Sequence, residues 1–153
     1  MTIRRAILAD VPSMTVLFQR TVLRATIRDY SEAQRQIWAE RGNDIARWKS
    51  RVLNQCFLLA EHSHHLLGMG SITTEGHIDV LYVHHAHQGE GVATKLLIQL
   101  EERAREQRLV RITTDASITA RPFFECRGYL VVKEQPNTLG DQVLVNYRME
   151  KIL

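Results

Sequence analysis

The chain has 153 residues, a formal net charge of +3, 44% hydrophobic residues and 24% charged residues. This length predicts one domain over residues 1–153, with a core that needs neither disulfides nor a metal for stability. No apolar run approaches the ~20 residues that span a bilayer, and the N-terminus lacks the apolar core of a signal peptide. We therefore expect a cytoplasmic protein without a membrane partner. The basic residues are scattered along the chain, so nucleic-acid binding is not indicated.

Hydrophobic periodicity and turn residues predict alternating groups of strands and helices. The predicted helices cover residues 10–25, 31–42, 45–53, 92–107 and 120–127. The predicted strands cover residues 2–8, 56–61, 66–74, 77–83, 110–115, 129–133 and 143–150, with a turn-rich stretch at 135–141. Ser31, with Gln34 three residues later, is typical of a capping box at the start of the second helix.

The sequence offers little support for a metal or redox site. Cys56 and Cys126 lie far apart, in a predicted strand and a predicted helix, and we expect buried, reduced thiols. Six of the seven histidines fall into two groups, which no metal-binding cysteine or His-Glu-x-x-His pattern accompanies. They are expected to be solvated loop residues: His62, His64, His65, His84, His85 and His87.

The glycine-containing run from Gln88 to Thr94 is the most informative motif. It lies between the predicted strand 77–83 and the predicted helix 92–107. Glycine permits close approach of the backbone to a ligand, and a helix N-terminus presents unpaired N–H groups. An ordinary strand-to-helix turn would have the same glycines, but the position favours a phosphate-binding loop.

Two common phosphate-binding motifs fit this run poorly. A Walker loop needs a Gly-Lys pair, which the chain lacks. A dinucleotide fingerprint needs a small residue at position 94, where Thr94 stands, although Asp115 lies at a suitable distance for a ribose-binding acid. The glycine loop of a dinucleotide fold also follows its first strand, whereas this loop lies past the middle of the chain. NAD binding therefore remains a weaker alternative.

Two motifs resemble those of the GCN5-related N-acetyltransferases. Gln88-x-x-Gly91-x-Ala93 is similar to the family's Q/R-x-x-G-x-G/A signature, whose loop binds the pyrophosphate of acetyl-coenzyme A. The stretch 115–129, with Phe123, Phe124 and Gly128, is similar to the family's later strand-and-helix motif A-x-x-F-[YF]-E-x-x-G-[FY]. The resemblance implies an α+β fold: a mostly antiparallel, splayed sheet of six to seven strands, flanked by four to five helices.

The resemblance also implies a co-substrate, acetyl-CoA, and a reaction, direct transfer of the acetyl group to an amine without a metal. It places the coenzyme against residues of the fourth strand, the glycine loop and the last helix. These residues are Leu81, Tyr82, Val83, Gln88, Gly89, Glu90, Gly91, Val92, Ala93, Thr94, Ser117, Ala120, Phe123, Phe124 and Arg127. A backbone N–H within 81–83 is the expected donor to the oxyanion.

An amine must lose a proton to react, so a general base is expected. Strand alternation would place His77, Asp79, Leu81 and Val83 on one face. Alignment to relatives with a glutamate base places His77 at that position, which makes it the first candidate and Asp79 the second. Each has a plain alternative: His77 as an exposed strand-edge residue, and Asp79 as a structural carboxylate that ties the strand to a loop.

Phe124 departs from the family pattern, because many members have a tyrosine there whose hydroxyl protonates the leaving thiolate. Tyr129 and Ser117 are near in sequence, but neither matches that position, and Tyr129 is expected to be a core aromatic. The missing hydroxyl leaves open a non-catalytic, acetyl-CoA-binding or sensing domain as the alternative function.

The amine acceptor is not identified by the sequence. Residues 30–39 resemble a Y-S-x-x-Q-x-x-x-W-A stretch of a subgroup of small bacterial acetyltransferases. Tyr30 and Trp38 are therefore candidate walls of an acceptor pocket, although Trp38 packing its helix on the sheet is the slightly favoured alternative. The acceptor is a small molecule or a protein amine, and the chain is expected to act as a monomer or homodimer.

Overall fold

The computed structural model describes residues 1–153 and contains one seven-stranded sheet in the order β1-β2-β3-β4-β5-β7-β6. The strands are β1 (Thr2–Arg5), β2 (Cys56–His62), β3 (His65–Ile72), β4 (His77–Val83), β5 (Arg111–Ser117), β6 (Leu130–Leu139) and β7 (Gln142–Ile152). The helices are α1 (Val11–Ala25), α2 (Glu32–Ala39), α3 (Ile45–Asn54), α4 (Val92–Glu106) and α5 (Arg121–Cys126), with short 3₁₀ turns at Leu8–Asp10, Glu40–Asn43 and His85–His87. Every strand pair except β4–β5 is antiparallel. The expected fold class is thus confirmed.

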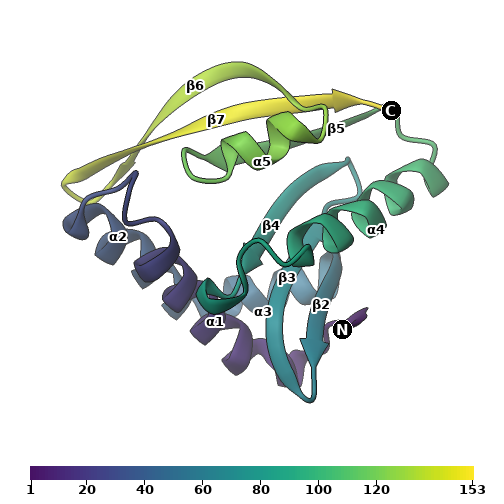
Figure 1. The fold of residues 1–153 in the computed structure, drawn as a ribbon, viewed down its shortest axis with the longest axis horizontal. Coiled ribbons are helices and arrows are strands. Elements are labelled where there is room, and N and C mark those ends of the chain that lie inside the picture. The colour runs from purple at the N-terminus through teal and green to yellow at the C-terminus, as the bar shows by residue number, and fades with distance from the viewer.

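The sheet divides into two parts where β4 and β5 diverge (Figure 1). These strands pair only at His77↔Thr113 and Ile78↔Thr114. Next to this pairing, the β3–β4 register skips Asp79, because Ser71 pairs with Val80 and Ile72 with Ile78. A bulge bends a strand and increases its local twist. Asp79 therefore stands where β4 turns away from β5.

The bulge also overturns the expected strand alternation. Ile78 and Val83 are five residues apart and would lie on opposite faces of a regular strand, yet both belong to the same core cluster. Val80 belongs to the cluster on the other face. His77, Asp79, Leu81 and Val83 consequently do not form one regular face, because the extra residue shifts the phase of the pleat.

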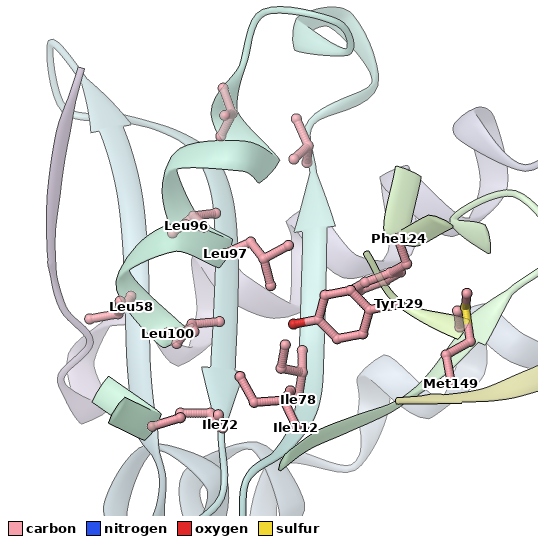
Figure 2. Packing of buried hydrophobic residues seen from close by; sticks show 14 of the residues in the cluster. Leu58, Ile72, Ile78, Leu96, Leu97, Leu100, Ile112, Phe124, Tyr129 and Met149 are labelled. Atoms are coloured by element: carbon pink, nitrogen blue, oxygen red, sulfur yellow. The ribbon is translucent and has the colours of Figure 1, made fainter. Parts of the chain in front are cut away.

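Two apolar cores cover the two faces of the sheet. On one face, α1 and α3 contribute Met14, Phe18 and Trp48 to a cluster with β2–β4. On the other, α4 contributes Leu96, Leu97 and Leu100 to a cluster that also contains residues of β5, α5 and β7. Figure 2 shows Tyr129 between Leu97 and Phe124, with Ile78 and Ile112 below. This second core joins the two parts of the sheet.

The last two strands form a longer hairpin than expected. Residues 135–139, expected within a turn, continue β6, and the chain reverses only at Gly140, whose φ is +56°. Pro136 is compatible with this because β6 is the edge strand and needs no second ladder of hydrogen bonds. The hairpin tip packs on α2, where Gln34 Nε2 donates to the Val143 carbonyl at 2.9 Å.

Of the other predictions for local structure, some are confirmed and some are wrong. The capping box is confirmed, since Ser31 and Gln34 exchange side-chain and backbone hydrogen bonds. The first strand ends at Arg5 rather than Leu8. Both cysteines differ from the expected burial: Cys56 is partly buried, and Cys126 is exposed because Phe124 is the only fully buried residue of the short helix α5. No helix has both the length and the apolar character needed to cross a membrane.

A polar network ties the two parts of the sheet at the base of the split. The His77 imidazole on β4 lies 2.8 Å from Thr113 Oγ1 through Nδ1, and 3.5 Å from Asp115 Oδ2 through Nε2. Arg148 Nε on β7 lies 2.8 Å from Asp115 Oδ1. The hydrogen bond with His77, aided by Gln135 and Arg148 and opposed by burial, lowers the pKa of Asp115 to about 2. The ionised carboxylate therefore links three strands.

This network predicts how stability responds to acid. A carboxyl whose pKa is depressed by folding stabilises the fold above its unfolded pKa, near ~3.9, and loses that contribution as the pH falls through the folded value. Asp115→Asn should lower the free energy of unfolding at pH 6 and reduce its fall between pH 5 and pH 2. Urea unfolding across this range measures both effects, with Asp141→Asn in the exposed hairpin turn as control. Equal pH slopes for wild type and Asp115→Asn would contradict the role of the network.

Candidate active site

A cavity of about 460 Å³ opens where β4 and β5 diverge. Its walls come from α1, β4, the glycine loop, the start of α4, the end of β5 and α5. The predicted coenzyme residues in these walls are Leu81, Tyr82, Val83, Gln88, Gly89, Gly91, Val92, Ala93, Thr94, Ser117, Ala120, Phe123, Phe124 and Arg127. Glu90 is the exception: it is outside the lining and lies 2.8 Å from His87 Nδ1. Segments between Thr21 and Arg127 of the sequence thus converge on one concave surface.

The glycine loop has a backbone that favours glycine. Gly89 and Gly91 have φ values of +74° and +82°, and a Cβ at either position would meet no atom within 4 Å. The backbone conformation, rather than lack of space, is therefore the reason for glycine. Gly91 is also the N-cap of α4 and provides no side-chain acceptor, which leaves first-turn N–H groups available to an anion.

Polar side chains hold the loop against its surroundings. Gln88 Nε2 donates to the Val83 carbonyl at 2.7 Å, which joins the loop to the end of β4. Arg127 Nη2 donates to Thr94 Oγ1 at 2.6 Å, and its guanidinium lies over the Phe123 ring at 5.5 Å. The start of α4 and the end of α5 are thus linked, with a positive charge between them.

The edge of β4 that faces the cavity has no neighbouring strand beyond Ile78. The Val83 carbonyl accepts hydrogen bonds from Gln88 Nε2 and, at 3.2 Å, from Thr21 Oγ1, so it points away from β3. In a strand, the N–H and C=O of one residue point to the same side, and residues two apart repeat this direction. The N–H groups of Leu81 and Val83 therefore face the open edge.

A smaller cavity of about 210 Å³ continues from the first one. The residues common to both linings are Trp38, Leu81, Tyr82, Ser117, Ala120 and Phe124. Tyr30 lines the smaller cavity, where its hydroxyl donates to the Val145 carbonyl at 2.6 Å and accepts from the Ile118 N–H at 2.9 Å. The Tyr30 and Trp38 rings meet edge to face at 5.2 Å. Both predicted acceptor residues thus lie in this wall.

Asp79, the second candidate base, lines the smaller cavity. Its Oδ2 accepts hydrogen bonds from Arg51 Nε at 2.9 Å and Gln55 Nε2 at 2.8 Å. Burial favours the neutral carboxyl, but these hydrogen bonds and the Arg51 charge lower the pKa of Asp79 below its ordinary value. A carboxylate so stabilised is a weak proton acceptor.

His77, the first candidate base, lines neither cavity. Both ring nitrogens lie near partners on β5, Thr113 and Asp115. Asp115 does line the smaller cavity. The imidazole is therefore one residue removed from the space where an amine fits.

The three residues considered for protonation of the leaving thiolate have different surroundings. Phe124 is 3% exposed and packs edge to face against Tyr129 at 5.1 Å. The Tyr129 hydroxyl donates to Glu101 Oε2 at 3.0 Å and lines neither cavity, as expected for a core aromatic. Ser117 lines both cavities, and its Oγ accepts from the Ala120 N–H at 3.0 Å, so its proton is free for donation.

Sequence reasoning missed several polar residues of the smaller cavity, namely Arg41, Asp115, Asn137 and Asn146. Asp115 was considered only as a ribose-binding acid, and Asn137 lay in the expected turn. Only the β6–β7 pairing, which extends across Gln135↔Asn146 and Asn137↔Leu144, brings the two asparagines to this wall. The apolar run 143–145 marks a strand in β7, but residues 135–139 contain no comparable pattern that would indicate the extension of β6.

Comparisons with known proteins agree with this geometry. The acetyltransferase (GNAT) domain family model matches residues 26–151. The chain is 34% identical over 126 residues to the uncharacterised N-acetyltransferase YafP of Escherichia coli K12, an alignment that covers 82% of this chain and 79% of that protein. It is 32% identical to a GCN5-related N-acetyltransferase from Rhodopseudomonas palustris, with a TM-score of 0.95 over 99% of this chain and 95% of that one.

A more distant structure shows the same fold with the coenzyme present. PaiA N-acetyltransferase from Thermoplasma acidophilum, solved in complex with coenzyme A, is 15% identical and has a TM-score of 0.82 over 99% of this chain and 98% of that one. The NAD-binding alternative has no support among these matches. From the family model and the two relatives above 30% identity, the chain belongs to the GCN5-related N-acetyltransferase family and is an acyl-CoA N-acyltransferase.

Proposed function

We propose that this protein transfers the acetyl group of acetyl-CoA directly to a primary amine. The observation that carries the proposal is the continuity of the two cavities at the split between β4 and β5, where six residues line both. The larger cavity contains the glycine loop and fits the coenzyme, and the smaller one fits an amine. A thioester at the junction would therefore be open to attack from the opposite side.

The geometry of the glycine loop supports the proposed position of the coenzyme. A pyrophosphate at 88–94 would receive N–H donors from the start of α4 and from the loop, with the Arg127 guanidinium nearby. The acetyl carbonyl would then lie along the open edge of β4. There the N–H groups of Leu81 and Val83 are positioned to bind the oxyanion when the amine nitrogen attacks the carbonyl carbon.

Proton transfer needs one acceptor and one donor. The attacking nitrogen forms the new C–N bond and gives its proton to a base, while the C–S bond breaks and the thiolate leaves. We retain His77 as the first candidate base, acting through a water molecule because it lines neither cavity, and Asp79 as the second. Ser117 is the donor that the geometry supports for the thiolate, in the absence of a hydroxyl at Phe124.

The alternative, a non-catalytic acetyl-CoA sensor, was suggested by Phe124 and by the lack of a glutamate base. Neither feature removes the acceptor cavity. A thiol has a reference pKa near ~8.5, so a thiolate leaves acceptably near neutral pH without full protonation. The sensor alternative therefore receives no support from the site.

The loop assignment predicts that acetyl-CoA stabilises the fold. At a ligand concentration ~100 times the dissociation constant, linkage gives roughly 2.7 kcal/mol and a clear rise in Tm. Gly91→Val should abolish this rise, because a β-branched residue disfavours φ near +82° and the loop must change shape. Differential scanning fluorimetry with and without acetyl-CoA measures the effect.

Gly128→Val is the matched control for that experiment. Gly128 also has a positive φ, of +90°, but lies outside the coenzyme cavity. We expect this variant to lower the Tm of the free protein and to keep the response to acetyl-CoA. A full response in Gly91→Val would refute the loop assignment.

The base assignment predicts a distinct pH dependence. If His77 accepts the proton, kcat/KM should rise with pH, and His77→Ala should lose roughly 10²–10⁴-fold in kcat/KM together with this pH dependence. Coenzyme A release, followed with a thiol reagent over a panel of amines, measures both. A wild-type rate in His77→Ala with a loss in Asp79→Asn would transfer the role to Asp79.

Arg51→Gln is needed to interpret Asp79→Asn. It removes the ion pair at 2.9 Å but keeps the carboxylate. If Asp79 only positions Arg51, both variants should lose activity equally, with no change in the pH profile.

The thiolate donor is tested by removal and by addition of a hydroxyl. Ser117→Ala should lower kcat, most strongly below pH 8, with little change in acetyl-CoA affinity, whereas Tyr129→Phe should leave kcat unchanged. Phe124→Tyr should raise kcat if its hydroxyl reaches the sulfur. Steady-state kinetics from pH 6 to 9 separates these outcomes; wild-type kcat in all variants would indicate that the thiolate leaves unassisted.

A further inference from the structure

A third cavity, of about 470 Å³, lies between α2, α3 and β4. Its lining shares Trp38, Arg41, Asp79 and Tyr82 with the smaller, acceptor-sized cavity described above. A ligand in the smaller cavity can therefore extend past Asp79 into this one. We refer to it as the arginine cavity, after Arg41, Arg47 and Arg51 in its wall.

The charges of the arginine cavity are unevenly paired. Arg51 Nε is bound to Asp79 at 2.9 Å, and its guanidinium lies over the Trp48 ring at 4.8 Å. Asp44, the other acid in the wall, is the N-cap of α3, where its Oδ1 accepts from the Arg47 backbone N–H at 3.2 Å. Each carboxylate thus already has a partner.

Arg41 and Arg47 have no such partner. Neither side chain makes a hydrogen bond or lies within 4.0 Å of a carboxylate, and no glutamate or lysine lines the cavity. An isolated exposed arginine needs no explanation, since water solvates it. Two unpaired guanidiniums in one concave wall, beside Trp38 and Trp48, form instead a surface suited to a planar anion.

We propose that the acceptor is an amine that also carries a carboxylate, which binds at Arg41 and Arg47. Its amino end occupies the smaller cavity, where Asp79 and Asp115 attract an ammonium group, and its carboxylate end occupies the arginine cavity. The orientation of the amine rests on the proposed acetyl transfer. The binding preference for a carboxylate does not.

The chain's two tryptophans provide a direct measurement, because Trp38 and Trp48 are its only ones and both line the arginine cavity. The protein, saturated with coenzyme A, is titrated with 6-aminohexanoate and 4-(aminomethyl)benzoate, and with the carboxamide of each. Tryptophan fluorescence excited at the red edge of the band follows binding. In at least one pair, the acid should bind about tenfold or more tightly than its amide, as expected for a charge-assisted hydrogen bond.

The preference should disappear in the double variant Arg41→Gln/Arg47→Gln. Lys49→Gln, which removes one positive charge from α3 outside all three cavities, should keep it. Equal binding of acid and amide in both pairs, no saturable signal from either acid, or an unchanged preference in the double variant would overturn the proposal.

Turnover separates this proposal from the proposed function. Coenzyme A release from acetyl-CoA is measured with the same four amines. Turnover without a preference for the acids would remove the carboxylate site and leave acetyl transfer in place. Binding that prefers the acids, without turnover of any amine in a wider panel, would instead count against the transfer and leave the carboxylate site supported.

Discussion

The short pairing between β4 and β5 is the constraint on which the site depends. A fully paired sheet would satisfy the backbone groups of β4 internally and leave no space for a ligand. Here the parallel ladder holds for only two residue pairs, and the bulge at Asp79 turns β4 aside. The strand edge that results is polar, open and lined on both sides by fixed side chains.

Such an edge must be stabilised, since unpaired strands bend, fray or associate with other edges. Two devices do this. The His77–Asp115–Arg148 network closes the base of the split, and the core of α4 packs against both parts of the sheet through Leu97, Tyr129 and Phe124 (Figure 2). At the other end of β4, Gln88 and Thr21 donate hydrogen bonds to the Val83 carbonyl. The opening is therefore built into the packed core and does not require a hinge.

The features that could be predicted are those that neighbouring residues determine. The glycine loop, the capping box at Ser31 and the order of most elements follow from short patterns, and the structure bears them out. The features that could not be predicted come from long-range pairing. Nothing in the local sequence of β4 marks Asp79 as a bulge, because the extra residue is defined only by its register against β3. Likewise, Pro136 suggests a turn until β6 is known to be an edge strand.

The proposed acceptor end of the site also depends on long-range contacts that the local sequence does not show. The basic residues are scattered in sequence and do not indicate a patch, yet the 3₁₀ turn Glu40–Asn43 and α3 bring Arg41, Arg47 and Arg51 to one wall. The sequence separation between Asp79 and Arg51 is 28 residues, and the bulge at the split between β4 and β5 also places Asp79 beside this cluster. The single bulged residue Asp79 thus lies at the split between β4 and β5 and also contacts the arginine cluster.

The arrangement of charges has a consequence for the chemistry. Asp79 and Asp115 are kept ionised by their arginine and histidine partners, and both line the smaller cavity. Two carboxylates beside an amine favour its protonated form, which helps the acceptor to bind but opposes its attack on the thioester. The proton must then leave for an acceptor that is not itself held as a stabilised anion. For the proposed acetyl transfer, this favours the His77 imidazole, reached through water, over Asp79 as the base, and different residues would then bind the amine and activate it.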